Sequence, residues 1–491
     1  FGVGFYAAFM VADLVTVTSR KAGSDEASVW SSDGRSGFTI DGALKDTRGT
    51  EIVLKLTDDA GEFLLAERLK TVIKKYSDHI TFPIEIDGAQ VNAASALWMR
   101  AKSEVTPEQY TEFYRSVSDT MGMDEPWLTL HWRAEGAIEY NNLLFIPSMK
   151  PFDLYDPKRP HGVKLYVKRV FITDGVEGLI PPFLRFVKGV VDSEDMPLNI
   201  SREMLQASPL VAKMGQAITR KILGELETRA KEDPKGFENF WALFGPVVKE
   251  GLYDAHAYRE QLCRVARFYS TKADGLTSLD EYIERMPQGQ EDIYYLSAPT
   301  LEAAKQSPQL EAFRAKNVEV LFMTDTVDEF WLPIQNDYKQ KKLKSVTRGN
   351  LDLSKVKGGQ QQEPQTGDAL EKLLIRMREV LTGEVKDVAV STRLVDSPVC
   401  LVAPDNDIDI HMQRVLKKTQ GYDGTHQHIL EVNAAHPLIK KLAAMAANSV
   451  DNETLRDTAF LLLDQARIVE GEPLKNPADF VRRMSLAMQK G

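Results

Sequence analysis

The segment 198–206, LNISREMLQ, carries the pattern best suited to chemistry. A serine able to cap a helix stands just before Arg202, so Gln206 lies one turn later on the same helix face. An arginine in a first helical turn can reach a phosphate held by another part of the chain and speed phosphoryl transfer by about 10³- to 10⁵-fold. The alternative, which spacing alone favours, is a surface ion pair of Arg202 with Asp195 or Glu203.

Two weaker patterns suit a phosphate or a nucleotide. Gly2 and Gly4 precede a short helix, so backbone N–H groups can point at an anion there. A tight turn is the commoner meaning of such a pair. Thr50 follows Gly49 at the start of a strand, where its hydroxyl could line a nucleotide pocket. A plain turn followed by a strand is the stronger alternative.

The remaining reactive side chains form no strong pattern. His426 and His428 lack the cysteines or carboxylates that usually complete a metal site, and we predict no metal there. Cys263 and Cys400 are too few for a disulfide framework, which fits a reducing compartment. We find no nucleophile and base arranged as in a serine or cysteine hydrolase.

Length and charge set the wider limits. The chain has 491 residues, a net charge of -10 and a hydrophobic fraction of 43%, and this length predicts about three domains. The acidic balance disfavours a nucleic-acid binder, and no stretch has the roughly 18 apolar residues of a membrane helix. The chain begins with Phe1, inside a motif, so we expect an N-terminal truncation that would have removed any targeting segment.

The elements that must position these residues fall into three blocks. Residues 1–92 mix strands and helices, and residues 93–338 follow an α/β pattern. The first block is predicted to contain strands at Val15–Thr18, Thr50–Leu56 and Phe82–Ile86, a hairpin turn at Asp33-Gly34, and an amphipathic helix at Glu62–Ile80. The second is predicted to contain strands at Leu128–Trp132, Leu143–Ile146 and Lys164–Thr173, helices at Leu205–Ala230 and around Phe237–Trp241, and a βαβ unit formed by Tyr294–Leu296, Thr300–Ala315 and Val318–Met323.

A polar stretch separates the third block. Residues 339–368 contain four lysines and a run of glycine and glutamine, which predicts a linker. Residues 369–491 form the last domain. It is predicted to contain a helix at Ala369–Leu381, strands at Val388–Leu394 and Val399–Ala403, and two final helices, Asn452–Glu470 and one capped by Asn476 with Pro477 in its first turn.

Several segments together resemble the heat-shock protein 90 chaperone family, in its bacterial HtpG-type form. The most specific is 198–206, and the resemblance extends over essentially the whole chain. The matching segments are FGVGFY at 1–6, YSDHI at 76–80, LW at 97–98, GVVDSED at 189–195, LNISREMLQ at 198–206, RMP at 285–287, IYY at 293–295 and HPLIK at 436–440.

The resemblance implies an α/β (α+β) fold in three domains. Residues 1–92 would be the latter half of a Bergerat (GHKL) nucleotide-binding domain, 93–338 the α/β middle domain, and 369–491 an α+β dimerisation domain ending in a helical hairpin. By the same resemblance Arg202 contacts the γ-phosphate, with Asn199 and Gln206 in supporting positions. Gly2, Val3, Gly4 and Phe5 match the phosphate-contacting turn and Thr50 the base of the nucleotide pocket.

Departures from the family pattern qualify this expectation. The glutamate that acts as base, the Mg²⁺-contacting asparagine and the adenine-reading aspartate of the family have no counterpart in these residues. We therefore expect the family cofactor, ATP with Mg²⁺, not to bind this fragment tightly and not to be hydrolysed by it. The lack of a long charged linker and of an acidic tail suggests a bacterial cytoplasmic form, with an organellar one left open.

The resemblance implies an ATP-dependent chaperone that remodels unfolded client proteins as a dimeric clamp. The last two helices would join two copies, and we expect no nucleic-acid or membrane partner. Client contact is expected at Trp98, Phe330 and Trp331, and on a helix carrying Met412 and Leu416, with core packing as the alternative. A nucleotide-independent holdase or scaffold is the rival function. Another GHKL ATPase, of topoisomerase or mismatch-repair type, is disfavoured by the acidic charge and by Arg202.

Overall fold

The computed structural model describes most of the chain and divides it into two compact units. The first unit comprises residues 1–181 and 185–218, and the second comprises 182–184 and 219–491. The described residues are 3–118, 124–136, 138–159, 162–196, 208–349, 351, 353, 355–356, 367–405, 407–421, 426–448 and 452–490.

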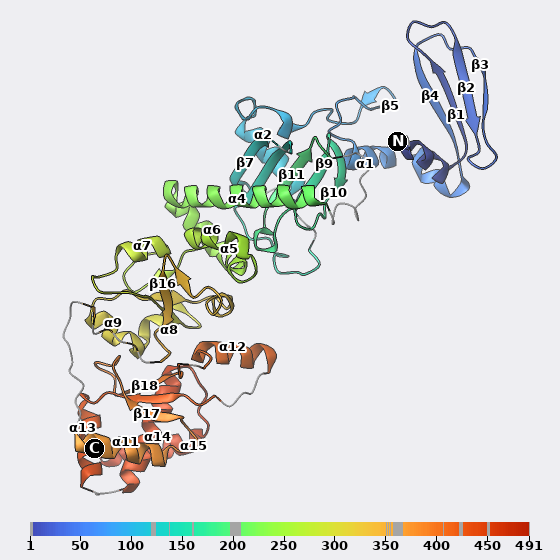
Figure 1. Ribbon diagram of the computed structural model, residues 1–491. Helices are drawn as coiled ribbons and strands as arrows, with labels where there is room; N and C mark the ends of the chain where they lie inside the picture. Colours follow the sequence, from blue (N-terminus) through green and yellow to red (C-terminus); the bar gives the residue numbers. More distant parts are fainter. Residues whose placement is uncertain are drawn as a thin grey trace. The chain divides into compact units, whose positions relative to one another are not determined.

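The first unit begins with an antiparallel sheet in the order β3-β2-β1-β4 (Figure 1). The predicted hairpin turn lies between β2 and β3, where the Asp33 carboxylate accepts hydrogen bonds from the backbone N–H groups of Arg35 and Ser36. The first predicted helix is a 3-10 helix, η1. The bounds are η1 Val3–Met10, β1 Ala12–Arg20, β2 Ala27–Ser32, β3 Thr39–Ala43 and β4 Gly49–Leu56.

The predicted helix Glu62–Ile80 is shorter than expected. A 3-10 helix, η2 (Asp58–Leu64), comes first, and the α-helix α1 occupies only Ala66–Tyr76. The ring of Tyr76 lies 5.8 Å from that of Phe171, so the end of α1 packs against the next sheet. A small hairpin of β5 (Glu85–Ile86) and β6 (Ala89–Gln90) follows.

The second sheet of this unit has the order β10-β9-β11-β8-β7. The single strand predicted at 164–173 is wrong: β9 and β10 are two antiparallel strands joined at Lys168 and Arg169, whose φ angles are 49° and 69°. All residues of β8 and β11 are buried, so these strands form the centre of the core. The bounds are β7 Pro126–Ala134, β8 Tyr140–Pro147, β9 Val163–Val167, β10 Val170–Thr173 and β11 Lys188–Ser193.

Short helices complete the first unit. Helix α2 starts at a capping box in which Thr106 and Gln109 satisfy each other's backbone N–H groups. The Trp98 side chain, on η3, packs with Tyr114 of α2 and Tyr166 of β9 in one hydrophobic cluster. The bounds are η3 Leu97–Met99, η4 Lys102–Glu104 and α2 Pro107–Val117.

Long helices open the second unit. The described part of the helix predicted at Leu205–Ala230 is α4, and its residues from 219 onward belong to this unit. Helix α5 buries Phe240, Trp241 and Phe244 along one face. The bounds are α4 Pro209–Glu232, η5 Pro182–Leu184, α5 Pro234–Asp254, η6 His256–Tyr258, α6 Arg259–Val265 and α7 Leu279–Glu284.

A mixed sheet in the order β12-β14-β13-β16-β15 contains the predicted βαβ unit, since β13 and β14 are parallel. The helix predicted between them is broken near Pro308 into three short turns, because proline cannot donate the backbone hydrogen bond. The bounds are β12 Tyr269–Ser270, β13 Ile293–Ser297, α8 Leu301–Gln306, η7 Pro308–Leu310, α9 Glu311–Ala315, β14 Leu321–Met323 and α10 Asp328–Trp331.

The linker predicted from residue 339 is wrong over its first part. Strands β15 (Asp337–Tyr338) and β16 (Lys341–Ser345) belong to this sheet, and β16 pairs in parallel with β13. The side chains of Leu343 and Ser345 are buried, while Lys342 and Lys344 face solvent. The glycine- and glutamine-rich run at 358–364 lies outside the described residues.

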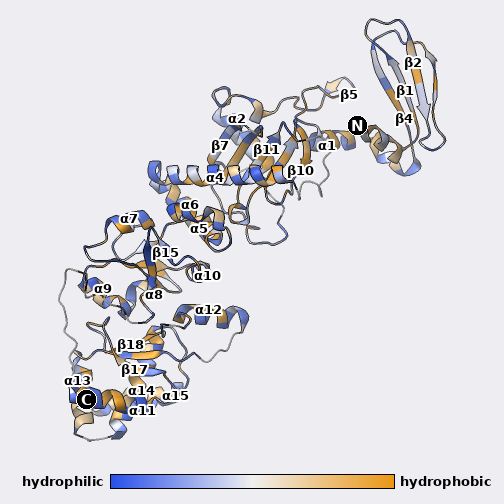
Figure 2. Cartoon of the chain, viewed as in Figure 1, coloured by the Kyte–Doolittle hydropathy of each residue, from blue (hydrophilic) through white to orange (hydrophobic). Residues whose placement is uncertain are grey.

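The last part of the second unit is a three-stranded sheet covered by helices, with β18 drawn mostly as hydrophobic in Figure 2. Arg393, in the connection between β17 and β18, is 1% exposed. It donates to both carboxylate oxygens of Glu431 and to the carbonyls of Val346 and Gly349. The bounds are α11 Asp368–Val380, β17 Asp387–Val390, β18 Val399–Val402, α12 Ile410–Gln420, β19 Ile429–Val432, α13 Pro437–Ala447, α14 Asn452–Val469 and α15 Pro477–Lys490.

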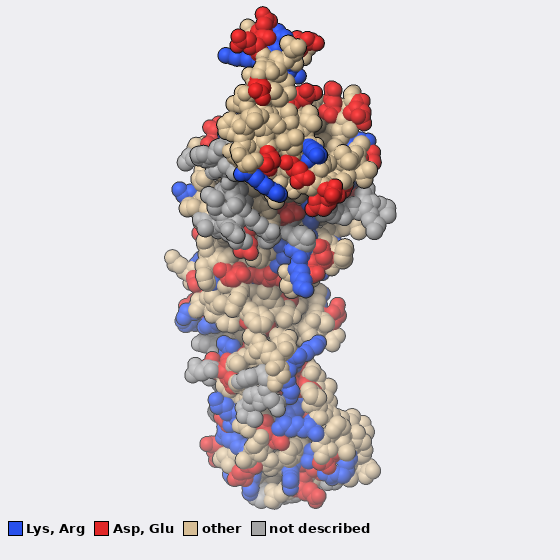
Figure 3. Space-filling model, turned by 90° about the vertical axis from the view of Figure 1, so that its right-hand side faces the viewer, with Lys and Arg blue, Asp and Glu red and all other residues tan. Residues whose placement is uncertain are grey.

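The prediction for the start of α15 is confirmed. The Asn476 side chain accepts a hydrogen bond from the backbone N–H of Asp479, and Pro477 is the first helical residue. Within the described residues, no helix is both long enough and apolar enough to cross a membrane. On the face shown in Figure 3, acidic and basic side chains are interspersed.

Candidate functional site

Strand β11 leads directly into the segment that carries Arg202, and its end is firmly held. Asp192 is 0% exposed and accepts hydrogen bonds from Trp98 Nε1 at 2.8 Å and from the backbone N–H of Arg169. Burial raises the pKa of Asp192, although these hydrogen bonds oppose the rise. At Gly189 the φ angle is 131°, and a Cβ atom would lie 2.2 Å from the carbonyl oxygen of Leu143, so only glycine fits.

Hydrogen bonds also fix the residues just after β11. The Asp195 carboxylate accepts from the backbone N–H of Glu139 at 2.6 Å, and the Ser193 hydroxyl accepts from the backbone N–H of Met196 at 3.3 Å. Side-chain hydrogen bonds therefore hold the chain up to Met196, the last described residue before 197–207. The predicted catalytic residues Asn199, Arg202 and Gln206 lie outside the described residues.

The nucleotide-contacting residues expected in the first sheet have separate surroundings. Gly4 and Phe5 lie on η1, and the Phe5 ring is 5.7 Å from that of Trp30. Thr50 is exposed, and its hydroxyl lies 2.9 Å from that of Ser19, at the other end of β1 from η1. The structure thus gives Phe5 and Thr50 different partners. Gly2 and the side chain of Val3 lie outside the described residues.

Two of the expected client-contacting aromatic residues lie in the core. Trp98 is 1% exposed and Trp331 is 0% exposed. Each indole N–H donates to a buried carboxylate, Trp98 to Asp192 and Trp331 to Asp328, both at 2.8 Å. The prediction of a client surface at Trp98 and Trp331 is therefore wrong for this conformation, and core packing is correct.

The other three expected client residues are partly exposed. Phe330 lies on α10, and Met412 and Leu416 lie on α12. The residues next to them connect the two helices, because His411 Nδ1 is 2.9 Å from Glu329 Oε1. Burial raises the pKa of Glu329, and the contact with His411 opposes that rise.

The Glu329–His411 contact joins positions 82 residues apart in sequence. Sequence reasoning missed it, since neither residue belongs to a motif. In the sequence, the only hint is that Glu329 precedes the apolar Phe330 and that His411 precedes the apolar Met412.

The two histidines just before β19 each lie against a carboxylate. His426 Nδ1 lies 2.6 Å from Asp407 Oδ1, and His428 Nδ1 lies 3.3 Å from Glu472 Oε1. Among the residues that the structure describes, no group of three or more His, Cys, Asp and Glu side chains is placed to hold a metal ion.

Comparison with known proteins identifies the family. Residues 85–491 match the family model described as Hsp90 protein. The chain is 49% identical to the chaperone protein HtpG of Paramagnetospirillum magneticum, over 100% of this chain and 80% of the relative. It is 48% identical to the HtpG of Roseobacter denitrificans, over 99% of this chain and 79% of the relative.

The chain belongs to the Hsp90 family. Its HtpG-type character is also supported by the HtpG of Rickettsia massiliae, which is 45% identical over 100% of this chain and 80% of the relative. The mixed helix and sheet architecture is consistent with an Hsp90 fold. The residues that match the Hsp90 family model contain strand β11 and helices α10 and α12.

Proposed function

We propose that the protein is a molecular chaperone that binds non-native proteins at a surface formed by α10 and α12. The Glu329–His411 contact at 2.9 Å is the observation that supports this surface most directly. Phe330 follows Glu329 on α10, Met412 follows His411 on α12, and both are partly exposed. Aromatic and methionine side chains adapt to varied apolar partners.

Suppression of aggregation tests this proposal. Phe330→Ser and Met412→Ser together should weaken the protection of a heat-unfolded test enzyme several-fold, measured by light scattering. Ile375→Ser is the matched control, because Ile375 is 47% exposed on α11, away from these helices in sequence. Equal protection by the double variant and the control would remove the surface from consideration.

We propose further that ATP with Mg²⁺ drives this chaperone, with Arg202 delivered to the γ-phosphate and Asn199 and Gln206 supporting it. The anchoring of Asp192 and Asp195 supports the proposal, since an arginine that acts on a phosphate needs a rigid base. In a form that carries the complete nucleotide domain, Arg202→Ala should lower ATP turnover at least 10-fold with little change in ATP affinity. Undiminished turnover would contradict this role.

For the 491 residues taken alone, we propose weak ATP binding and no turnover. Support comes from the first sheet, where Ile52, Val53 and Leu54 of β4 are 38% to 56% exposed and so lack a covering layer. Mg-ATP should leave the thermal unfolding temperature unchanged, and a saturable stabilisation would contradict this. Aggregation suppression that is independent of ATP would favour the rival function, a nucleotide-independent holdase.

Dimerisation through the last helices completes the proposed clamp. Val481, Met484 and Met488 on α15 are 60%, 42% and 72% exposed, and a second copy would bury them. Met484→Glu with Met488→Glu should convert a dimer to a monomer in gel filtration, while Gln489→Glu on the same helix should not. We propose a bacterial cytoplasmic location, in keeping with the HtpG relatives.

A further inference from the structure

One histidine packs the connection between α1 and β5 against the aromatic cluster beside the second sheet. The ring of His79 lies 4.6 Å from that of Trp98, 6.2 Å from that of Phe113 and 5.9 Å from that of Tyr166, with interplanar angles of 65° to 71°. These aromatic partners come from η3, α2 and β9, so a single side chain joins the connection to three elements. None of the functions proposed above uses this contact.

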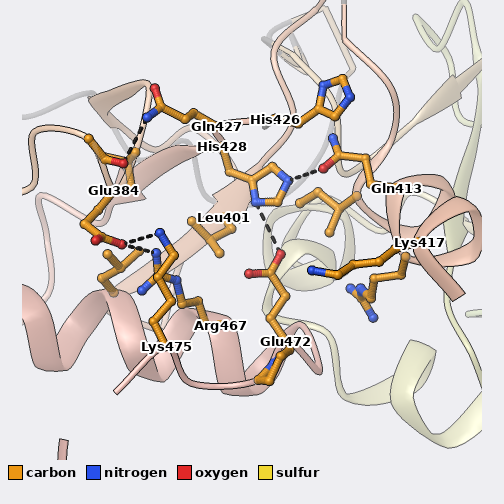
Figure 4. Close-up of a pocket in the computed structure, with 16 residues that line it drawn as sticks. Glu384, Leu401, Gln413, Lys417, His426, Gln427, His428, Arg467, Glu472 and Lys475 are labelled. Atoms are coloured by element: carbon orange, nitrogen blue, oxygen red, sulfur yellow. Dashed lines mark hydrogen bonds and ion pairs between the residues drawn. The ribbon is translucent and has the colours of Figure 1, made fainter. Parts of the chain in front are cut away.

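A hydrogen bond fixes which nitrogen of the ring carries the proton. His79 Nδ1 lies 2.9 Å from the carbonyl oxygen of Ser95. A carbonyl only accepts, so the neutral ring has its proton on Nδ1, and Nε2 would take a second one. Within the described part of the chain, Nε2 makes no hydrogen bond. His428 differs, because its Nε2 lies 3.0 Å from Gln413 Oε1 and its Nδ1 lies 3.3 Å from Glu472 Oε1 (Figure 4).

The charges that face His79 oppose one another. Asp78 favours the protonated ring, while Lys164 of β9 and Lys74 of α1 disfavour it. The elements η3 and α2 bring only uncharged rings to the contact, and burial raises the pKa of Tyr166, so its phenol stays neutral. Burial is the largest influence on His79 and lowers its pKa. The ring is therefore neutral at neutral pH and takes a proton only in acidic solution.

The backbone beside this contact is strained. Ala94, next to Ser95, has a φ angle of 51°, a left-handed conformation that is uncommon for alanine. Its backbone N–H donates to the carbonyl of Asp78 at 3.0 Å, and the N–H of Ala93 donates to the Asp78 carboxylate at 2.9 Å. These contacts hold a conformation that costs energy, and it can relax once they are lost.

We propose that His79 is an acid-sensitive pin, whose neutral ring holds the connection between α1 and β5 onto the aromatic cluster and whose protonation releases it. Because the pKa of His79 is lower in the pinned state, the pin is at full strength above the usual pKa of histidine. It weakens as pH falls below that value and levels off below the lowered pKa. The proposal does not rest on the proposed ATP or client sites, because none of the residues proposed for them takes part.

An NMR titration of the 491-residue chain, labelled at its histidine rings, tests the protonation step. The signal of His79, assigned by its absence in His79→Gln, should titrate at lower pH than a histidine in an unstructured peptide. A signal that titrates at the same pH as the peptide, or at a higher pH, would overturn the proposal.

Hydrogen exchange of the backbone amides of Ala93 and Ala94 tests the release. Their protection, corrected for the intrinsic effect of pH on exchange, should fall several-fold between about pH 7.5 and about pH 5.5. In His79→Phe, whose ring still packs but does not titrate, the protection should change little between the two. A wild type without this pH dependence, or a His79→Phe variant that retains it, would overturn the proposal.

Two other histidines provide the controls. His131 also contacts Trp98, since its Nε2 lies 3.2 Å from the Trp98 carbonyl, and burial lowers its pKa as well. His256 is exposed on η6. His131→Phe and His256→Phe should both keep the wild-type pH dependence of exchange, and an unchanged circular dichroism spectrum at neutral pH checks that the variants fold. Loss of the dependence in His131→Phe, with His79→Phe unaffected, would make His131 the sensor and overturn the proposal.

Discussion

Lys249 Nζ lies 2.9 Å from Asp328 Oδ1, in a fully enclosed contact between α5 and α10. A second carboxylate, that of Asp325, is 2.8 Å from the same nitrogen, and the Phe268 ring lies 4.8 Å away. Burial alone would lower the pKa of a lysine, but the two carboxylates outweigh it and raise the pKa of Lys249. The residue therefore stays charged.

Replacing Lys249 with methionine should destabilise the second unit by about 3–5 kcal/mol, because Asp328 would remain buried without a cation. Urea unfolding measures this loss. Adding Asp328→Asn to Lys249→Met should restore part of the stability, since the unpaired charge is then removed. A loss below about 1 kcal/mol for the single variant would show that the pair contributes little.

Because the pKa of Glu470 is raised in the folded chain, we expect the free energy of unfolding to depend on pH. Its pKa is about 7 in the folded chain against 4.5 for an unperturbed glutamate, so the folded state binds the proton more tightly. The free energy of unfolding should therefore fall as pH rises from about 4.5 to 7, by roughly 1.4 kcal/mol per pH unit, and then level off.

Thermal unfolding of the wild type and of Glu470→Gln at several pH values measures this effect. The variant should lose the Glu470 part of the slope, because its amide does not titrate. Glu472→Gln, two residues away and more exposed, is the comparison. Parallel curves for the wild type and Glu470→Gln would contradict the expectation.

Asp192 should matter for stability in the first unit. Asp192→Ala leaves the Trp98 indole N–H and the Arg169 backbone N–H without their acceptor, which costs about 2–4 kcal/mol. Asp174→Ala is the matched control at an exposed aspartate and should cost less than about 0.5 kcal/mol. Tryptophan fluorescence during urea unfolding reports the difference.

The Glu329–His411 contact should couple α10 to α12. His411→Ala leaves the Glu329 carboxylate buried without its partner, with an expected loss of about 1–3 kcal/mol. Hydrogen exchange of the α12 amides should also become faster, because the helix loses an anchor. Glu302→Ala, at an exposed position on α8, should change neither quantity.

The sequence predicted elements best where local chemistry decides them. Asn476 and Pro477 define the start of α15 by themselves, and the parallel βαβ unit follows from its apolar segments. The turn at Lys168-Arg169 was missed, because charged residues seldom adopt positive φ in a hairpin. Strand β16 was missed because its lysines resemble a linker, although Leu343 between them is buried.

The candidate site was predictable only in part. The motif at 198–206 indicates its chemistry, but the acceptor for Trp98 is Asp192, 94 residues away, and no local pattern announces that pairing. Trp331 differs, because its acceptor Asp328 lies only three residues away on α10, but the burial of both side chains depends on the tertiary fold. Pairings between distant polar side chains depend on the tertiary fold, and periodicity does not encode them.

Arg393 has a mechanical consequence. Its guanidinium binds Glu431 of the last sheet and, at the same time, the carbonyls of Val346 and Gly349 just beyond β16. If the last sheet separated from the residues beyond β16, the Arg393 guanidinium would lose acceptors and the oxygens left behind would lose their donor. The two parts should therefore unfold in one cooperative transition. Force applied across this joint would meet a brittle contact that breaks all at once rather than yielding gradually.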